Sequence, residues 1–150
     1  MTWKHYQCTI KDNLASVLID QQFQEHYPLK ELPQLFWVGI YCDLASDGAF
    51  WNPEETQALD EIEKHLLMLG QSFGNGWMVF LFRIATPGIR EYYFYYGDGA
   101  EVQKIVPALM NFHPKYRIES GFRLDTDWVE YRKYISFDNS ILNHGCPIKN

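Results

Sequence analysis

The stretch Ile89-Arg90-Glu91-Tyr92-Tyr93-Phe94-Tyr95-Tyr96 decides how this sequence folds, because it is a strand-length run of aromatic residues directly after a turn. The turn is Pro87-Gly88, and the apolar segment 77–86 precedes it, so the two segments are expected to form a β-hairpin. Side chains alternate between the two faces of a strand. The alternation gives two sets, one on each face: Arg90, Tyr92, Phe94 and Tyr96, and Glu91, Tyr93 and Tyr95.

An apolar run and a well-marked helix lie before this hairpin. Residues 35–42 are continuously apolar, which is typical of a strand covered on both faces. A helix is expected from Pro53, with Asn52 as its N-cap and Gly70 as its end. Its apolar residues recur at helical spacing, and the acids in its first turn suit the helix dipole.

A second helix, a strand and a short helix are expected after the hairpin. Asp98 and Glu101 have the spacing of a capping box, and Pro107 should kink the second helix or move its start. Residues 116–124 are expected to be a strand. Capping-box spacing occurs again at Asp127 and should open the short helix.

The order of these elements predicts the fold class. From residue 35 the order is β-α-β-β-α-β, the split βαβ arrangement of ferredoxin-like folds. We therefore expect an α+β protein whose two helices cover one face of an antiparallel sheet. Residues 4–9 and 15–22 should form an N-terminal hairpin that extends the sheet or packs beside it. We expect a single domain over residues 1–136 and a C-terminal tail over residues 137–150.

Charge and hydropathy argue against two classes of function, general nucleic-acid binding and membrane spanning. The chain has 150 residues and a net charge of −6, which opposes general binding to nucleic-acid phosphates. No apolar run approaches the roughly 20 residues that a membrane span needs, and the first residues lack the apolar core of a signal peptide. We expect a cytoplasmic protein that contacts no membrane.

Cysteine and histidine positions predict neither a disulfide framework nor a metal site. Cys8, Cys42 and Cys146 are odd in number and widely spaced, so three reduced thiols are expected. No histidine lies at zinc-ligand spacing from a cysteine pair. We expect no metal and no cofactor.

Five short motifs follow one another in a fixed order. They are Trp3-x-x-Tyr6, Asp47-Gly48 before a Pro-Glu-Glu helix, the segment 88–95, Tyr116-Arg117-Ile118-Glu119, and Asp127-Trp128-x-x-Tyr131. In this order they resemble a bacterial family, the domain of unknown function 695, over about residues 3–135. The resemblance implies a small ferredoxin-like domain that is distantly similar to regulator of ribonuclease E activity B. Because that regulator acts by binding an enzyme, the resemblance also implies an interaction module.

Catalytic motifs are missing from the sequence. There is no Gly-x-Ser-x-Gly, and the glycine-rich segment 70–76 lacks the Lys-Ser/Thr of a phosphate-binding loop. We therefore expect a protein-binding or regulatory module without catalysis, with inhibition of a nuclease or toxin as one form of regulation. Glu54, Asp60 and Glu61 on the first helix are the candidate docking surface for a partner with a basic surface.

Two alternatives stay open. Asp47, Arg90 and Glu91 could form a polar pocket near a strand end, with Tyr92 and Tyr96 nearby, and so bind a small ligand or act as an enzyme. An open aromatic face would resemble the RNA-recognition motif and bind single-stranded RNA, although the strand 89–96 lacks the glycines of that motif. We expect instead that the N-terminal hairpin or a second subunit covers this face, and a homodimer is left open.

Overall fold

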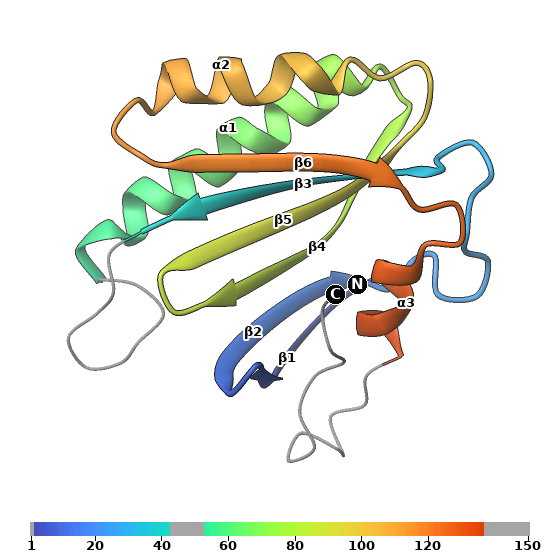
Figure 1. Ribbon diagram of the computed structural model, residues 1–150, viewed down its shortest axis with the longest axis horizontal. Coiled ribbons are helices and arrows are strands. Elements are labelled where there is room, and N and C mark those ends of the chain that lie inside the picture. Colours follow the sequence, from blue (N-terminus) through green and yellow to red (C-terminus); the bar gives the residue numbers. More distant parts are fainter. Residues whose placement is uncertain (1, 43–52, 137–150) are drawn as a thin grey trace.

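The computed structural model of the chain describes residues 2–42 and 53–136. The elements, in chain order, are β1 (Trp3–Ile10), β2 (Asn13–Asp20), β3 (Gln34–Tyr41), the 3-10 turn η1 (Pro53–Glu55), α1 (Thr56–Gly74), β4 (Met78–Thr86), β5 (Ile89–Tyr96), η2 (Val102–Lys104), α2 (Ile105–Phe112), β6 (Ile118–Leu124) and α3 (Val129–Ile135). Figure 1 shows one sheet with α1 and α2 on one side and α3 on the other. The fold is therefore α+β, as expected.

The sheet is open, six-stranded and antiparallel. Its strand order is β1-β2-β4-β5-β3-β6, and every neighbouring pair is antiparallel. The N-terminal hairpin extends the sheet, since Val17 of β2 pairs with Ile84 of β4. The strand β3 lies between β5 and β6, and β6 ends the sheet.

The face toward α1 and α2 carries the first of the two predicted side-chain sets. Arg90, Tyr92, Phe94 and Tyr96 are all buried, and the last three pack in one cluster with residues of α1 and α2. Aliphatic residues of the two helices dominate the helical side of that cluster: Leu59, Ile62, Leu66, Leu69, Ile105 and Leu109. The alternation predicted for residues 89–96 is confirmed.

The opposite face is covered by α3. Tyr93 and Tyr95 lie in a second buried cluster with three large rings of the last segment, Trp128, Tyr131 and Tyr134. The expectation that the hairpin or a second subunit covers this face is wrong. The physical reason is that β2 hydrogen-bonds to β4 and stays within the sheet, which leaves the face to the aromatic residues of α3.

A β-bulge interrupts the pairing of β4 with β5. The register shifts between Phe80 and Phe82, so that two consecutive residues, Leu81 and Phe82, belong to the cluster under α3. Both are fully buried. A bulge bends its strand and increases the local twist, which helps β4 and its neighbours curve around α3.

The end of α1 differs from the prediction. The helix continues past Gly70 to Gly74, and Asn75 takes the left-handed cap with φ 53°. Gly70 is buried, and a Cβ atom built there would lie 3.5 Å from the ring of Phe94. Gly70 thus lies inside α1 where the helix packs on β5, at a distance that is ordinary van der Waals contact for a Cβ atom. Asn52, the predicted N-cap, lies outside the described residues.

The start of α2 agrees with the sequence prediction, and the capping residue of α3 does not. The helix α2 begins at Ile105, so Pro107 lies in its first turn, where a missing N–H group costs little. The predicted shift of the start is thus confirmed. At α3 the capping residue is Asp125 and not Asp127, because Asp125 Oδ1 accepts the N–H of Val129 at 2.9 Å.

The cysteine expectation is wrong for Cys8. Cys8 is disulfide-bonded. The spacing of cysteines along a chain does not show which of them folding brings together, so the sequence did not reveal this bond. Disulfides persist mainly in oxidising compartments. Cysteine usage therefore no longer supports the expectation of a cytoplasmic protein.

The predicted tail, residues 137–150, lies outside the described residues.

Candidate functional site

One end of the sheet gathers several of the predicted site residues. Here β3 ends at Tyr41, which pairs with Ile89 at the start of β5, and the chain enters α1 nearby. Arg90 and Asp60 meet at this end. Asp47 lies outside the described residues. Tyr96 lies at the far end of β5, where its hydroxyl donates a hydrogen bond to Gln34 Oε1 at 2.8 Å.

Arg90 belongs to a polar cluster beneath α1. It is 3% exposed, and its Nη1 lies 3.7 Å from Asp60 Oδ1 and 3.9 Å from Glu63 Oε1. Glu63 Oε1 also contacts Arg83 Nη1 at 2.5 Å and accepts a hydrogen bond from the Tyr92 hydroxyl at 2.9 Å. Two arginines from β4 and β5 thus converge on one carboxylate of α1, and the cluster fixes the helix on the sheet.

Sequence reasoning found three members of this cluster and missed two. Arg90, Tyr92 and Asp60 were candidates, whereas Glu63 and Arg83 were not. A usable signal was present: Arg83 pairs with Tyr92 across the hairpin, and Glu63 lies one helical turn after Asp60. Burial, and next the charge of Glu63, raise the pKa of Tyr92, so that its phenol stays protonated.

Glu91 lies on the other face of β5. Side chains alternate along a strand, and Tyr93, two residues further on, lies in the cluster under α3. Burial and the nearby Glu91 carboxylate raise the pKa of the Tyr93 phenol. Arg90 and Glu91 therefore point away from each other, and the structure does not join them in one pocket. The small groove that Glu91 does line, of about 190 Å³, lies between the β1–β2 turn and Ile84.

A larger cavity lies where β3 ends and β6 begins. It has a volume of about 400 Å³ and is lined by Tyr41, Cys42, Glu55, Lys115, Tyr116 and Arg117. The Tyr116 hydroxyl donates a hydrogen bond to Glu55 Oε2 at 2.7 Å, which joins the segment before β6 to the start of α1. Sequence reasoning missed this cavity, although Tyr116 and Arg117 stand in one of the quoted motifs.

Charged side chains lie on the wall of this cavity and beside it. The Arg117 guanidinium lies 4.1 Å from the centre of the Tyr41 ring and 2.9 Å from Glu119 Oε1, and Tyr41 donates a hydrogen bond to Glu119 Oε2 at 2.8 Å. The hydrogen bond from Arg117, then that from Tyr41, lowers the pKa of Glu119. The same bond to Glu119 raises the pKa of Tyr41. The wall thus offers a cation and ordered hydrogen-bonding groups.

The predicted acidic surface lies on the outward side of α1 and the turn before it. Glu54 and Glu61 are exposed, and the side chain of Asp60 is 63% exposed even though it contacts Arg90. Asp60 therefore connects the buried cluster to the surface. These three acids are the exposed part of the predicted site.

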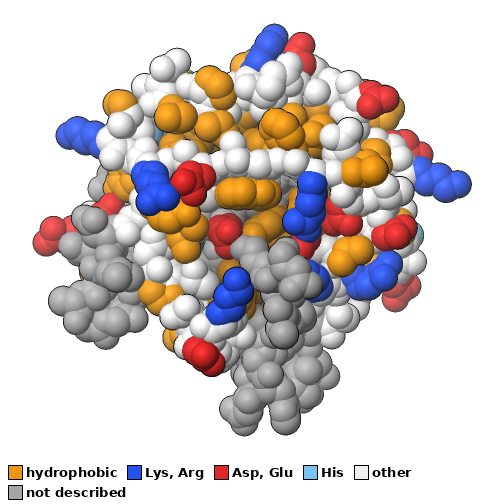
Figure 2. Space-filling model, viewed as in Figure 1, with side chains coloured by type: hydrophobic (Ala, Val, Ile, Leu, Met, Phe, Trp, Pro, Cys, Tyr) orange, Lys and Arg blue, Asp and Glu red, His pale blue; other side chains and the backbone are white. Residues whose placement is uncertain are grey.

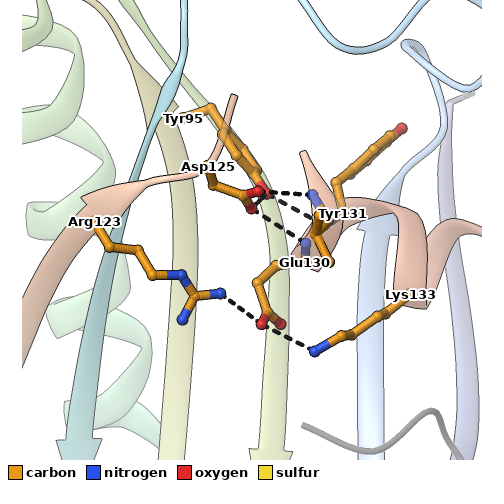
Figure 3. A network of polar contacts seen from close by, with 7 residues as sticks. Tyr95, Arg123, Asp125, Glu130, Tyr131 and Lys133 are labelled. Atoms are coloured by element: carbon orange, nitrogen blue, oxygen red, sulfur yellow. Dashed lines mark hydrogen bonds and ion pairs between the residues drawn. The ribbon is translucent and has the colours of Figure 1, made fainter. Parts of the chain in front are cut away.

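A second polar network joins α3 to the sheet, and Figure 3 shows its members converging between β5, β6 and α3. Asp125 Oδ2 accepts hydrogen bonds from the Tyr95 hydroxyl at 2.6 Å and the N–H of Glu130 at 3.2 Å. Glu130, 2% exposed, is held by Arg123 at 2.6 Å and Lys133 at 3.2 Å. Tyr93 and Tyr95 lie buried beneath this network, so their rings are not a platform for stacking RNA bases.

The described ranges, 2–42 and 53–136, hold neither a membrane-spanning helix nor a metal-binding group of side chains. No helix there is both long and apolar enough to cross a membrane. No three His, Cys, Asp or Glu side chains of these ranges are grouped so that they could hold a metal ion.

The comparisons with known proteins identify a family and nothing further. A family described as "Family of unknown function (DUF695)" matches residues 1–136, and the chain belongs to it. No curated protein and no solved structure matches the chain. The similarity to regulator of ribonuclease E activity B therefore stays a prediction.

Proposed function

We propose that this protein is a non-catalytic domain that regulates another protein by binding it, through the acidic outward side of α1. One observation carries the proposal: Glu54, Asp60 and Glu61 are exposed on the outward side of α1 and the turn before it, and the side chain of Asp60 stays 63% exposed although it contacts Arg90. Exposed acids on a chain of net charge −6 steer a basic surface toward themselves. The regulated protein would then be a nuclease, a toxin or another protein with a basic binding face.

Charge reversal on α1 tests this proposal. The variant Glu54→Lys with Glu61→Lys leaves Asp60 in place, so the contact with Arg90 is kept. A matched control, Glu25→Lys with Asp98→Lys, makes the same charge change at exposed positions elsewhere. In a pull-down from its native host after nuclease treatment, wild type and control should retain a protein that salt releases, and the α1 variant should lose it. Equal retention by both variants would contradict the proposal.

A second candidate function is binding of a small ligand in the cavity beside Tyr41, favoured by the volume of about 400 Å³ and its ordered polar wall. A thermal-shift screen of small carboxylates and phosphates would detect it. Lys115→Ala should abolish any shift, and Lys104→Ala, an exposed lysine outside the cavity, should not. A ligand whose effect survives Lys115→Ala does not bind in this cavity.

We also propose that the part of the fold from β3 to β6 is ferredoxin-like. The order β4-β5-β3-β6, with α1 and α2 on one face, supports this topology. An experimental structure would test it, because a different neighbour for β3 would remove the likeness.

A further inference from the structure

The outer edge of β6 forms one border of the sheet. The strand ends the sheet, and no described strand pairs with its outer side. Two hydrogen bonds to β3 fix which backbone groups face outward: Tyr41 donates to the carbonyl of Arg117, and Asp125 donates to the carbonyl of Pro33. In an antiparallel ladder the pairing groups alternate, so the N–H and C=O groups of Ile118, Ser120, Phe122 and Leu124 point away from β3.

This edge has little of the usual protection against pairing. Natural edge strands are commonly blunted by charged side chains, above all lysine, or by proline, a bulge or very short length. The charged residues of β6 are one acid and one base, Glu119 and Arg123. The strand β6 has seven residues, contains neither proline nor lysine, and keeps an unbroken register with β3. Its Phe122 and Leu124 are 57% and 70% exposed. Figure 2 shows hydrophobic side chains gathered over the region of α2 and β6, with charged side chains beside them.

The strand is complementary to itself in one register. When two copies run antiparallel about a two-fold axis through Gly121, Glu119 of each lies opposite Arg123 of the other, and Ile118 lies opposite Leu124. Centring the axis on Ser120 would place Arg117 opposite Arg123. Centring it on Glu119 would place that residue opposite itself, and centring it on Phe122 would place Glu119 opposite Asp125. Of these four registers, only the one centred on Gly121 joins opposite charges and opposes no like charges.

The same register suits the backbone and the side chains. Ser120 would form hydrogen-bonded pairs with Phe122, and Ile118 with Leu124, through the groups that point outward. Glu119 and Arg123 would then occupy non-hydrogen-bonded positions, where opposite side chains come closest. Both are held in place by their own chain, Glu119 by Tyr41 and Arg123 by Glu130, while their side chains stay 43% and 48% exposed. This order lowers the entropic cost of pairing.

We propose that two copies of this chain associate through β6 into a two-fold symmetric dimer with one continuous sheet, in the register centred on Gly121. Such an interface is the same patch on both copies and closes on itself, so it stops at two chains. The proposal is independent of the acidic surface of α1 and of the cavity beside Tyr41.

The test is a charge swap between two full-length variants, followed by sedimentation or light scattering over a concentration series. Glu119→Lys would face Arg123, and Arg123→Glu would face Glu119, so each variant alone should dimerise at least about tenfold more weakly than wild type. An equal mixture pairs Lys with Glu and Arg with Glu, and should return to within about threefold of wild type. Rescue by mixing also shows that both variants are folded.

A backbone variant supplies the second measurement. Ser120→Pro removes an outward N–H without removing a bond to β3, and should leave a folded monomer, whereas Ser120→Ala should dimerise as wild type does. Wild type that stays monomeric up to about 200 µM would overturn the proposal. A dimer that Ser120→Pro leaves intact would place the interface elsewhere, and failure of the mixture to recover would refute the register.

Discussion

The two faces of the sheet are covered by different means. On one face, α1 and α2 bury mainly aliphatic side chains, and one cluster of arginines and carboxylates holds α1. On the other face, the seven-residue helix α3 and Trp128, the residue just before it, bring three large rings to the sheet. Two of these side chains use their polar tips in hydrogen bonds: Trp128 donates to the carbonyl of Leu32 at 2.8 Å, and Tyr131 donates to the carbonyl of Asp20 at 2.6 Å.

This difference teaches how a short helix covers a broad surface. Long helices distribute their burial over many side chains of moderate size, so no single one dominates. A short helix has few inward positions, and aromatic residues bury the most area per position while their polar tips fix direction. We therefore expect α3 to depend on few residues and α1 on many.

Removing Trp128 should have the largest effect. Trp128 is fully buried and stacks on Tyr95 with ring centres 4.4 Å apart, so Trp128→Ala should cost about 4 kcal/mol of unfolding free energy. Leu66→Ala, fully buried on α1, should cost about 3 kcal/mol. Urea denaturation measures both losses of unfolding free energy. A larger loss for Leu66→Ala would contradict the expectation that α3 depends on few residues and α1 on many.

Removing Glu63 should have the next largest effect. Glu63→Ala would leave Arg83 and Arg90 facing each other beneath α1, at a cost of about 2 kcal/mol, less than for a fully buried pair because Glu63 is 26% exposed. Glu61→Ala, on the outward side, should change stability by less than about 0.5 kcal/mol. Denaturation in low and high salt would check this, and similar costs for both variants would mean that the cluster does not hold α1.

Replacing the cap of α3 should have a smaller effect. Asp125→Ala removes the acceptor for Val129 N–H and for the Tyr95 hydroxyl, and should cost about 1–2 kcal/mol. Asp127→Ala removes the residue that the capping-box spacing favours, and should cost less than about 0.5 kcal/mol. If Asp127→Ala lowers the free energy of unfolding more than Asp125→Ala does, in thermal or urea unfolding, then Asp127 is the capping residue.

Mild acidification should have the smallest effect on stability, through His113 on the face covered by α1 and α2. His65 Nδ1 and His113 Nε2 lie 2.7 Å apart between α1 and the end of α2. Burial, and next the charge of His65, lower the pKa of His113, while Glu61 opposes this. The unfolded chain therefore takes up this proton first, and stability present above about pH 6.5 should fall as the pH decreases below it. Urea denaturation at about pH 7.5 and 5.5 should show a smaller decrease for His113→Gln than for wild type.

The sequence predicted what depends on local pattern. The bounds of β5, the division of its side chains between two faces and the apolar stripe of α1 all follow from periodicity. The partners of Arg90, the cap at Asp125 and the cavity beside Tyr41 did not follow. The partners of Arg90 depend on how α1 packs on the sheet, and the cavity depends on β3 lying between β5 and β6, which brings Tyr41 beside Arg117. No spacing within one segment contains that information. The cap is a local contact, but the capping-box spacing pointed to Asp127 instead of Asp125.

The bulge in β4 has a consequence for how this family can change in length. Losing one residue from a regular strand moves every following side chain to the opposite face. Between Phe80 and Phe82 the ladder already accommodates an unmatched residue, Leu81. A relative lacking one residue at that point would keep both faces in place, so single-residue gaps within this strand of aligned relatives should concentrate there.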